Sequence, residues 1–171
     1  MKKIKHNAPY IIVALITLII FCIITFVKPK EENNNNNIDT SMFNVVNSKD
    51  VLRMINNNET QMIVIGSRTC SATKEFVSSM QISQAKGSYI INYLELKDED
   101  IKSESYKKFL KKLEVPFNGM TEDNKEHTIK EFMGTTPMIL IIKNKKVVYG
   151  NVGLMLSDPL TQLAYTYGVA K

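Results

Sequence analysis

Residues 65–74 read Ile65-Gly66-Ser67-Arg68-Thr69-Cys70-Ser71-Ala72-Thr73-Lys74, so that an apolar run ends, a short polar loop follows and a helical pattern begins. The preceding run, residues 62–65, is apolar throughout and has the length of a strand buried on both faces. Residues 70–85 have helical spacing, with Val77 and Met80 on the inward side. Cys70 is therefore expected where a strand ends and a helix begins.

A cysteine at a helix start is favoured as a thiolate. Free backbone N–H groups and the positive end of the helix dipole stabilise the anion. Arg68 and Lys74 are cations close in sequence, and the hydroxyl of Thr73 lies one turn further on, where it can donate to the sulfur. The alternative is a buried cysteine that acts as a small apolar side chain. The polar neighbours favour an accessible, reactive thiol.

The rest of this region alternates between helix and strand patterns. The expected elements are a helix that Ser48 caps, a strand at 62–65, a helix at 70–85, a strand at 89–96, a helix that Ser103 caps, a helix at 121–133, strands at 138–142 and 147–149, and a final helix that Asp158 caps and Gly168 ends. The first two strands and their helix predict a right-handed parallel βαβ unit. A tight turn at Asn144-Lys145 predicts an antiparallel hairpin.

A second motif precedes the hairpin. Residues 134–138 read Gly-Thr-Thr-Pro-Met, which places Pro137 directly before an apolar strand. Proline cannot donate to a strand ladder and is tolerated at the first position of a strand. The Thr136-Pro137 bond can take the cis form there.

The two motifs in this element order resemble the thioredoxin superfamily, over about residues 48–168. The resemblance implies an α/β fold of three layers with a central mixed sheet. It also implies that Cys70 is the reactive residue and that Thr136-Pro137 lies across from it. The backbone of Thr136 would then pair with a bound peptide or a thiol tripeptide. The motif loop and the apolar N-terminus are most similar to membrane-anchored thioredoxin-like proteins described as bacteriocin transport accessory proteins.

Three departures from the superfamily pattern limit the chemistry. Thr73 stands where a dithiol member has its second cysteine, Thr69 stands where the usual tryptophan is found, and Val64 replaces the buried aspartate. A lone thiolate can attack a disulfide and form a mixed disulfide. It cannot release itself without a second thiol, so an external thiol must resolve the adduct.

The N-terminal part of the chain is expected to be a membrane anchor. Residues 8–27, Ala8 to Val27, contain no charge and are long enough to span a hydrocarbon core. A cleaved signal peptide would have a shorter apolar region and small residues before the cut. Three lysines precede the span, which favours a cytoplasmic N-terminus and a domain outside the cytoplasm. We therefore expect a tail at 1–7, an anchor at 8–27, an Asn-rich linker at 28–41 and the thioredoxin-like domain at 42–171.

Composition narrows the classes of function. Apolar residues make up 44% and charged residues 23% of the 171 residues, as in an ordinary globular domain. Cys70 and His127 are the only cysteine and histidine beyond the apolar segment, so we expect no metal and no cofactor. The net charge of +5 is concentrated at the N-terminus, and the one dense basic cluster falls on the polar side of a predicted helix. We expect no nucleic-acid partner.

Three functions remain open from the sequence. The first is monothiol thiol–disulfide exchange by Cys70, as an oxidoreductase or isomerase, with protein or peptide clients and an external resolving thiol. The second is a non-catalytic binding or chaperone-like accessory module, for example for export of a peptide or protein. The third, an Fe–S or other metal role, is disfavoured because one cysteine offers one ligand per chain.

Overall fold

The computed structural model describes residues 38–97, 101–118 and 125–171. The predicted anchor at 8–27 and most of the predicted linker lie outside these residues. Among the described residues, no helix combines the length and the apolar character that a membrane span requires. The chain from Asn36 onward forms one compact unit, and Ile38 is already part of its core, with 7% of its surface exposed.

A mixed five-stranded sheet forms the centre of this unit. Its strands are β1 (Asn44–Val46), β2 (Gln61–Gly66), β3 (Ile91–Glu95), β4 (Met138–Lys143) and β5 (Lys146–Val152), arranged in the order β1-β3-β2-β4-β5. β3 runs parallel to both β1 and β2. β4 runs antiparallel to β2 and to β5. The predicted parallel βαβ unit and the predicted antiparallel hairpin are both confirmed.

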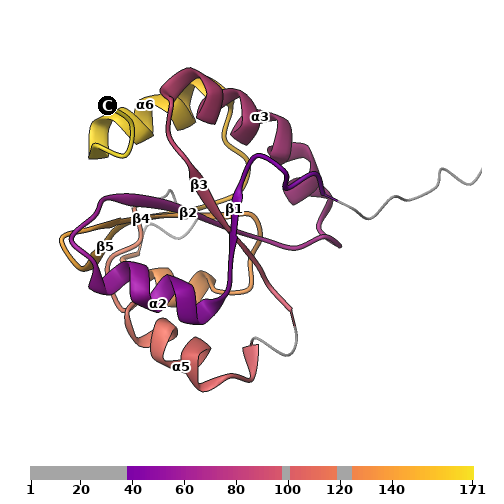
Figure 1. The fold of residues 1–171 in the computed structure, drawn as a ribbon. Helices are drawn as coiled ribbons and strands as arrows, with labels where there is room; N and C mark the ends of the chain where they lie inside the picture. The colour runs from indigo at the N-terminus through magenta and orange to yellow at the C-terminus, as the bar shows by residue number, and fades with distance from the viewer. Residues whose placement is uncertain (1–37, 98–100, 119–124) are drawn as a thin grey trace, which may run out of the picture. The chain divides into compact units, whose positions relative to one another are not determined.

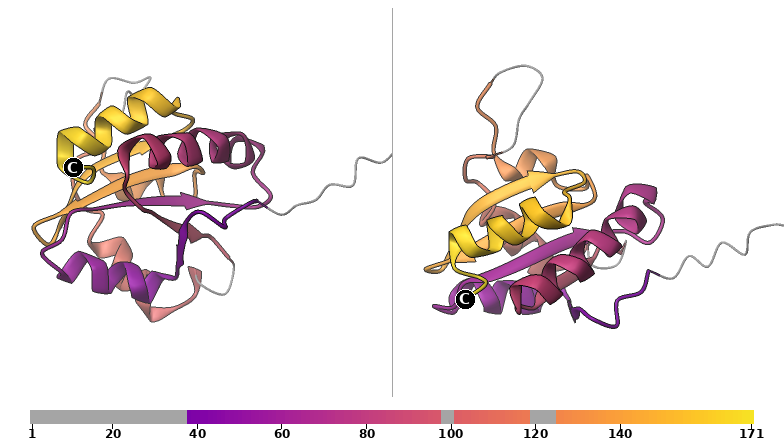
Figure 2. Two further views of the ribbon diagram at one scale, coloured as in Figure 1. Left: turned by 45° about the horizontal axis from the view of Figure 1, so that its top comes forward. Right: turned by 90° about the horizontal axis from the view of Figure 1, so that it is seen from above.

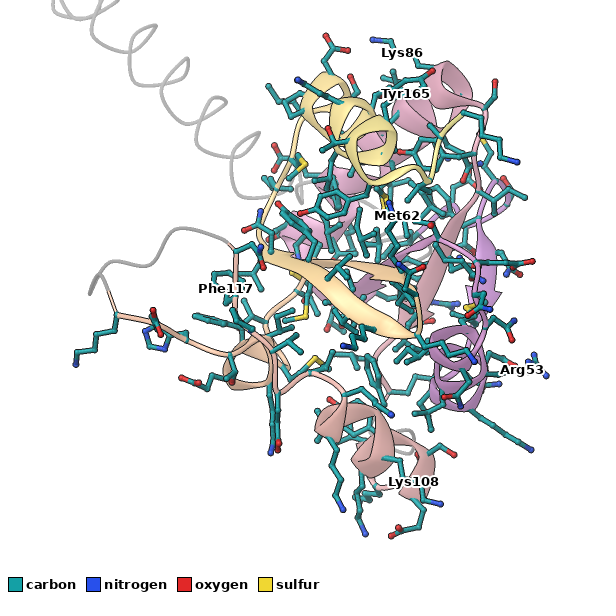
Figure 3. The ribbon with its side chains drawn as sticks, turned by 90° about the vertical axis from the view of Figure 1, so that its left-hand side faces the viewer. Arg53, Met62, Lys86, Lys108, Phe117 and Tyr165 are labelled. Atoms are coloured by element: carbon teal, nitrogen blue, oxygen red, sulfur yellow. The ribbon has the colours of Figure 1, made fainter. Side chains whose placement is uncertain are left out.

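Helices cover both faces of the sheet. Figures 1 and 2 show α2 (Ser48–Asn56) and α5 (Glu104–Lys111) on one face, and α3 (Ser71–Gly87) and α6 (Ser157–Tyr167) on the other. The alternation of side chains along β2 divides the core, because Met62 and Val64 pack toward α3 and α6 while Ile63 and Ile65 pack toward α2 and α5. Figure 3 shows side chains, Met62 among them, filling the space between the sheet and the helices. The predicted α/β fold of three layers with a central mixed sheet is confirmed.

One strand was missing from the sequence prediction. β1 has only three residues, and Asn44 and Val45 are exposed while Val46 is buried. A segment this short carries no alternating pattern that distinguishes a strand from a loop. β1 is held by a residue distant in the sequence, because the Asn44 side-chain amide donates to Asn92 Oδ1 on β3 at 2.7 Å.

Two predicted helix caps are wrong by one or two residues. Asn47, not Ser48, caps α2, since its side chain accepts hydrogen bonds from the backbone N–H groups of Lys49 and Asp50. Ser48 is instead the first residue of the helix and is buried. Leu156 occupies the cap position of α6, and Asp158 lies in its first turn. The predicted cap at Ser103 is confirmed.

The predicted helix at 121–133 is wrong in its described part. Residues 119–124 lie outside the described residues, and from 125 onward the structure has only a short 3₁₀ helix, η1 (Ile129–Phe132). The preceding chain is extended, with a bridge between Pro116 and Thr128. The rings of Phe117 and Phe132 lie 4.2 Å apart between their centroids. Backbone hydrogen bonds from Phe117 to His127 and from Ile129 to Val115 hold the segment in this extended path despite its helical spacing.

The turn of the β4–β5 hairpin is confirmed. Asn144 and Lys145 both have positive φ, 53° and 63°. This backbone is that of a tight hairpin turn whose twist matches the strands.

The pH dependence of stability provides a test of the η1 region. Hydrogen bonds from His127 and from the backbone and hydroxyl of Thr128 lower the pKa of Glu131 from 4.5 to about 2. A carboxyl group with a lowered pKa in the folded chain stabilises the fold above its unfolded pKa and ceases to do so as the pH falls through the folded value. We expect Glu131→Gln to melt at a lower temperature than wild type at pH 4.5, and this difference to shrink toward pH 2.

The measurement is a series of thermal melts across this range. Glu126→Gln, which changes an exposed carboxylate five residues earlier, is the matched control. A difference for Glu131→Gln that widens as the pH falls would contradict the assignment.

Candidate functional site

Cys70 lies at the junction between β2 and α3, as the sequence predicts. It occupies the cap position of α3, with φ −85° and ψ 118°. The loop before it is a tight turn, in which the backbone N–H of Cys70 donates to the carbonyl of Ser67 at 3.1 Å. The hydroxyls of Ser67 and Thr69 lie 2.8 Å apart. The thiol is free and partly exposed.

The Thr136-Pro137 motif lies against the thiol. The peptide bond between these residues is cis, and Pro137 directly precedes β4. Cys70 Sγ lies 3.2 Å from the carbonyl oxygen of Thr136 and donates to it. Sixty-six residues separate the two in sequence. The antiparallel pairing of β2 with β4 joins them, because it aligns the end of one strand with the start of the other.

The surroundings of Cys70 favour its anion. Burial raises the pKa of Cys70, but hydrogen bonds from the side chains of Thr136 and Thr73 and from the backbone of Thr73 and Ala72 outweigh it, so that the pKa lies below its ordinary value. Hydroxyl and N–H donors stabilise a thiolate. The bond from the thiol to the Thr136 carbonyl belongs to the protonated form. The site therefore has a hydrogen-bond acceptor for the thiol form of Cys70 and hydrogen-bond donors for its thiolate form.

Arg68 is held by an acidic partner on the neighbouring strand. Its Nε lies 2.7 Å from Glu95 Oε1, and the Glu95 side chain is only 12% exposed. The groups that lower the pKa of Cys70 are hydrogen-bond donors, whereas Arg68 neutralises a carboxylate at the end of β3. The structure thus places Arg68 beside the site in a structural ion pair.

Thr73 fills the position where a second motif thiol would lie. It is fully buried in the first turn of α3, and its hydroxyl accepts from the backbone N–H of Ser67 at 3.4 Å. The same hydroxyl contributes to lowering the pKa of Cys70. Thr73 therefore ties the motif loop to the helix and favours the thiolate form of Cys70.

Gly66, Tyr93 and Glu95 also surround the motif loop, although no sequence pattern marked them as site residues. Gly66 ends β2, and a Cβ placed on it would lie 2.6 Å from both Thr73 Cγ2 and the Tyr93 hydroxyl. Tyr93 is buried on β3, next to Val64 in the β2–β3 register. A glycine at the end of an apolar strand signals close approach of another group. The identity of that group depends on the register between strands, which the sequence does not reveal.

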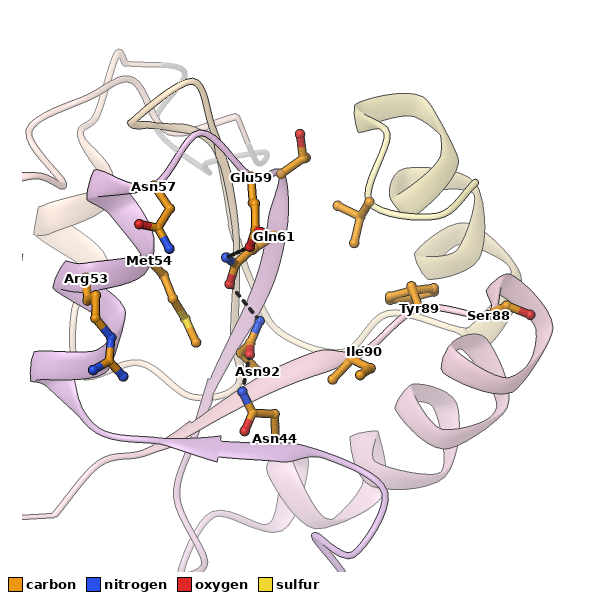
Figure 4. Close-up of a pocket in the computed structure, with 12 residues that line it drawn as sticks. Asn44, Arg53, Met54, Asn57, Glu59, Gln61, Ser88, Tyr89, Ile90 and Asn92 are labelled. Carbon is orange, nitrogen blue, oxygen red and sulfur yellow. Dashed lines mark hydrogen bonds between the residues drawn. The ribbon is translucent and has the colours of Figure 1, made fainter.

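A separate hollow lies at the other end of the sheet, where β2 and β3 begin. It has a volume of about 700 Å³ and is lined by residues of both strands and of α2. Figure 4 shows a row of side-chain amides there, in which Asn92 donates to Gln61 and accepts from Asn44. These amides satisfy one another across three strands, so the hollow is separate from the thiol site in both position and chemistry.

Comparisons of this chain with known proteins return matches among solved structures only. No known family model and no curated protein sequence matches it. Among solved structures it is similar to thioredoxin from Aeropyrum pernix, with 10% identity over 71% of this chain and 83% of that one and a TM-score of 0.47. Chlamydomonas reinhardtii thioredoxin f2 is 13% identical over 75% and 99%, with a TM-score of 0.48. An uncharacterized thioredoxin-like protein from Clostridium perfringens is 16% identical over 84% and 92%, with a TM-score of 0.46. Such a likeness concerns the fold alone.

Substitution of Gly66 tests the packing beneath the motif loop. We expect Gly66→Ala to lower the free energy of unfolding by roughly 1–3 kcal/mol, the usual cost of overpacking a core. The double variant Gly66→Ala/Tyr93→Phe should recover little, because the Tyr93 ring carbon at 2.8 Å and Thr73 Cγ2 remain in the way. Urea denaturation measures both. Wild-type stability in Gly66→Ala would show that the loop relaxes freely.

Proposed function

We propose that this protein performs monothiol thiol–disulfide exchange through Cys70. The observation that carries the proposal is the placement of a free, partly exposed thiol at the start of α3, with its sulfur 3.2 Å from the Thr136 carbonyl. Donors from α3 and Thr136 lower the pKa of Cys70, and the thiolate is the nucleophile in such exchange.

The exchange proceeds in two balanced steps. The Cys70 thiolate attacks one sulfur of a client disulfide, forms a mixed disulfide and releases the other client sulfur as a thiolate. An external thiolate then attacks the mixed disulfide, returns Cys70 to its thiolate and leaves a new disulfide between the client and the external thiol. Thr73 has no sulfur and takes no part in the second step. The clients are protein or peptide thiols and disulfides.

We further propose that the domain acts outside the cytoplasm, tethered by residues 8–27. The uncharged N-terminal span and the lysines before it support this topology. The resemblance of the motif loop and N-terminus to bacteriocin transport accessory proteins supports a role beside the export of a peptide. In this proposal Thr136 and Pro137 have supporting roles. They form one wall of the thiol site, and their backbone groups are available to pair with a bound client.

A non-catalytic accessory module is the second candidate. It is favoured by one observation, that the position of a resolving thiol holds a fully buried threonine. Such a module would bind its client at the same face without turnover. The two candidates differ in whether Cys70 forms mixed disulfides.

Restoring the second thiol tests the proposal. Wild-type protein should form mixed disulfides with a disulfide reagent that persist until an external thiol is added. Thr73→Cys should reduce insulin more than wild type, because Thr73 lies in the first turn of α3, three residues after Cys70, where a sulfur can attack the adduct. The gain should be partial, since Val64 supplies no buried acid to activate the second thiol.

Ser71→Cys is the matched control. It adds an exposed thiol beside Cys70 in sequence, where the geometry of a disulfide is strained. Cys70→Ser sets the baseline. The accessory-module candidate takes first place if wild type forms no mixed disulfide and Thr73→Cys reduces no more insulin than Cys70→Ser.

Labelling of introduced cysteines tests the topology. In a Cys22→Ser/Cys70→Ser background, Asn35→Cys places a thiol in the linker and Lys3→Cys places one before the span. We expect a membrane-impermeant maleimide to label Asn35→Cys in intact cells and Lys3→Cys only after lysis. The reverse pattern would place the domain in the cytoplasm.

A further inference from the structure

The hydroxyl of Tyr93 is buried without a hydrogen-bond partner. The residue is 1% exposed, and within the described ranges its oxygen is the only buried side-chain nitrogen or oxygen that lacks a partner. By contrast, the hydroxyl of Tyr89, a buried tyrosine four residues earlier, lies 2.7 Å from Ser83 Oγ. The unpaired state is therefore particular to Tyr93.

An unpaired buried hydroxyl costs stability. A phenylalanine fills nearly the same volume and leaves no polar group to desolvate. Buried polar groups without a hydrogen-bond partner are few in a folded protein, and each calls for an explanation, of which a role in a functional site is one. Its location thus decides whether the Tyr93 hydroxyl has a function.

The Tyr93 hydroxyl lies directly beneath the motif loop, which joins β2 to α3. It is 2.6 Å from the place a Cβ on Gly66 would take, and Thr73 Cγ2 is equally close to that place. Thr73 lies in the first turn of α3, and its hydroxyl contributes to lowering the pKa of Cys70. The Tyr93 hydroxyl, Gly66 and Thr73 therefore lie together under the loop that carries Cys70.

We propose that Tyr93 is a positioning residue for Cys70, whose hydroxyl turns its hydrogen toward the motif loop and stabilises the thiolate by the electrostatic field of its dipole. This inference rests on the proposed thiol chemistry. In the thiol form the hydroxyl has no partner, whereas ionisation of Cys70 creates negative charge toward which its dipole is free to turn. The energetic cost of the unpaired hydroxyl is thus recovered only in the reactive form of the site.

The charges around Tyr93 keep it a neutral donor. Burial raises the pKa of Tyr93, the Glu95 and Cys70 charges raise it further, and Arg68 opposes them. The phenol thus stays protonated wherever Cys70 titrates. Arg68 and Glu95 form their own ion pair, and Lys74 lies in the first turn of α3.

The test is the pH dependence of Cys70 alkylation by iodoacetamide. Tyr93→Phe should shift the profile to higher pH and lower the rate at neutral pH by roughly three- to tenfold, the effect of one neutral hydrogen-bond donor. Its melting temperature should equal or exceed that of wild type, because an unpaired hydroxyl has been removed. Replacement of Tyr93 by 3-fluorotyrosine, a stronger donor, should shift the profile to lower pH.

Tyr89→Phe is the matched control, since it removes a buried hydroxyl that has a partner. It should lower the melting temperature and leave the profile in place. The inference is overturned if Tyr93→Phe leaves the profile unchanged, or if Tyr89→Phe shifts it equally. Because alkylation needs no client, a shifted profile together with absent mixed disulfides would refute the proposed function and leave the role of Tyr93 standing.

Discussion

The hydrogen bonding of β2 on both of its edges is the constraint on which the rest of the structure depends. β3 pairs with it in parallel and β4 pairs with it antiparallel. The residue Ile65 is aligned with Leu94 on one side and with Met138 on the other. The loop that follows β2 must therefore meet the loop that precedes β4. The contact between Cys70 and Thr136 is a product of sheet register, and neither motif could create it alone.

The elements predictable from the sequence are those with a strong local pattern. The apolar runs that became β2 and β4 are of strand length and buried on both faces, and Tyr106 and Phe109 of α5 follow helical spacing. Elements that depend on distant partners were not predictable. β1 is held by its pairing with β3, and the segment before η1 is extended where its backbone pairs with residues 115–117.

The same division applies to the thiol site. The position of Cys70 at a helix start follows from a strand pattern, a polar loop and a helix pattern in sequence, and Pro137 marks the start of β4. The pairing of Arg68 with Glu95 was not visible, because it needs the register of β2 against β3. The close packing of Gly66 on Tyr93 was hidden for the same reason. The position of the candidate thiol was thus predictable from the sequence, whereas the groups packed beneath it became visible only in the structure.

The edges of the sheet determine how the domain behaves toward its own copies. An exposed strand edge is a template for pairing with another molecule. β1 offers three residues at one edge, and at the other the β4–β5 ladder shifts register between Ile141 and Ile142. Lys146 adds an exposed charge at the start of β5. A second molecule would meet a three-residue strand at one edge and a strand interrupted by a register shift at the other, and both features disfavour pairing between the sheets of two copies.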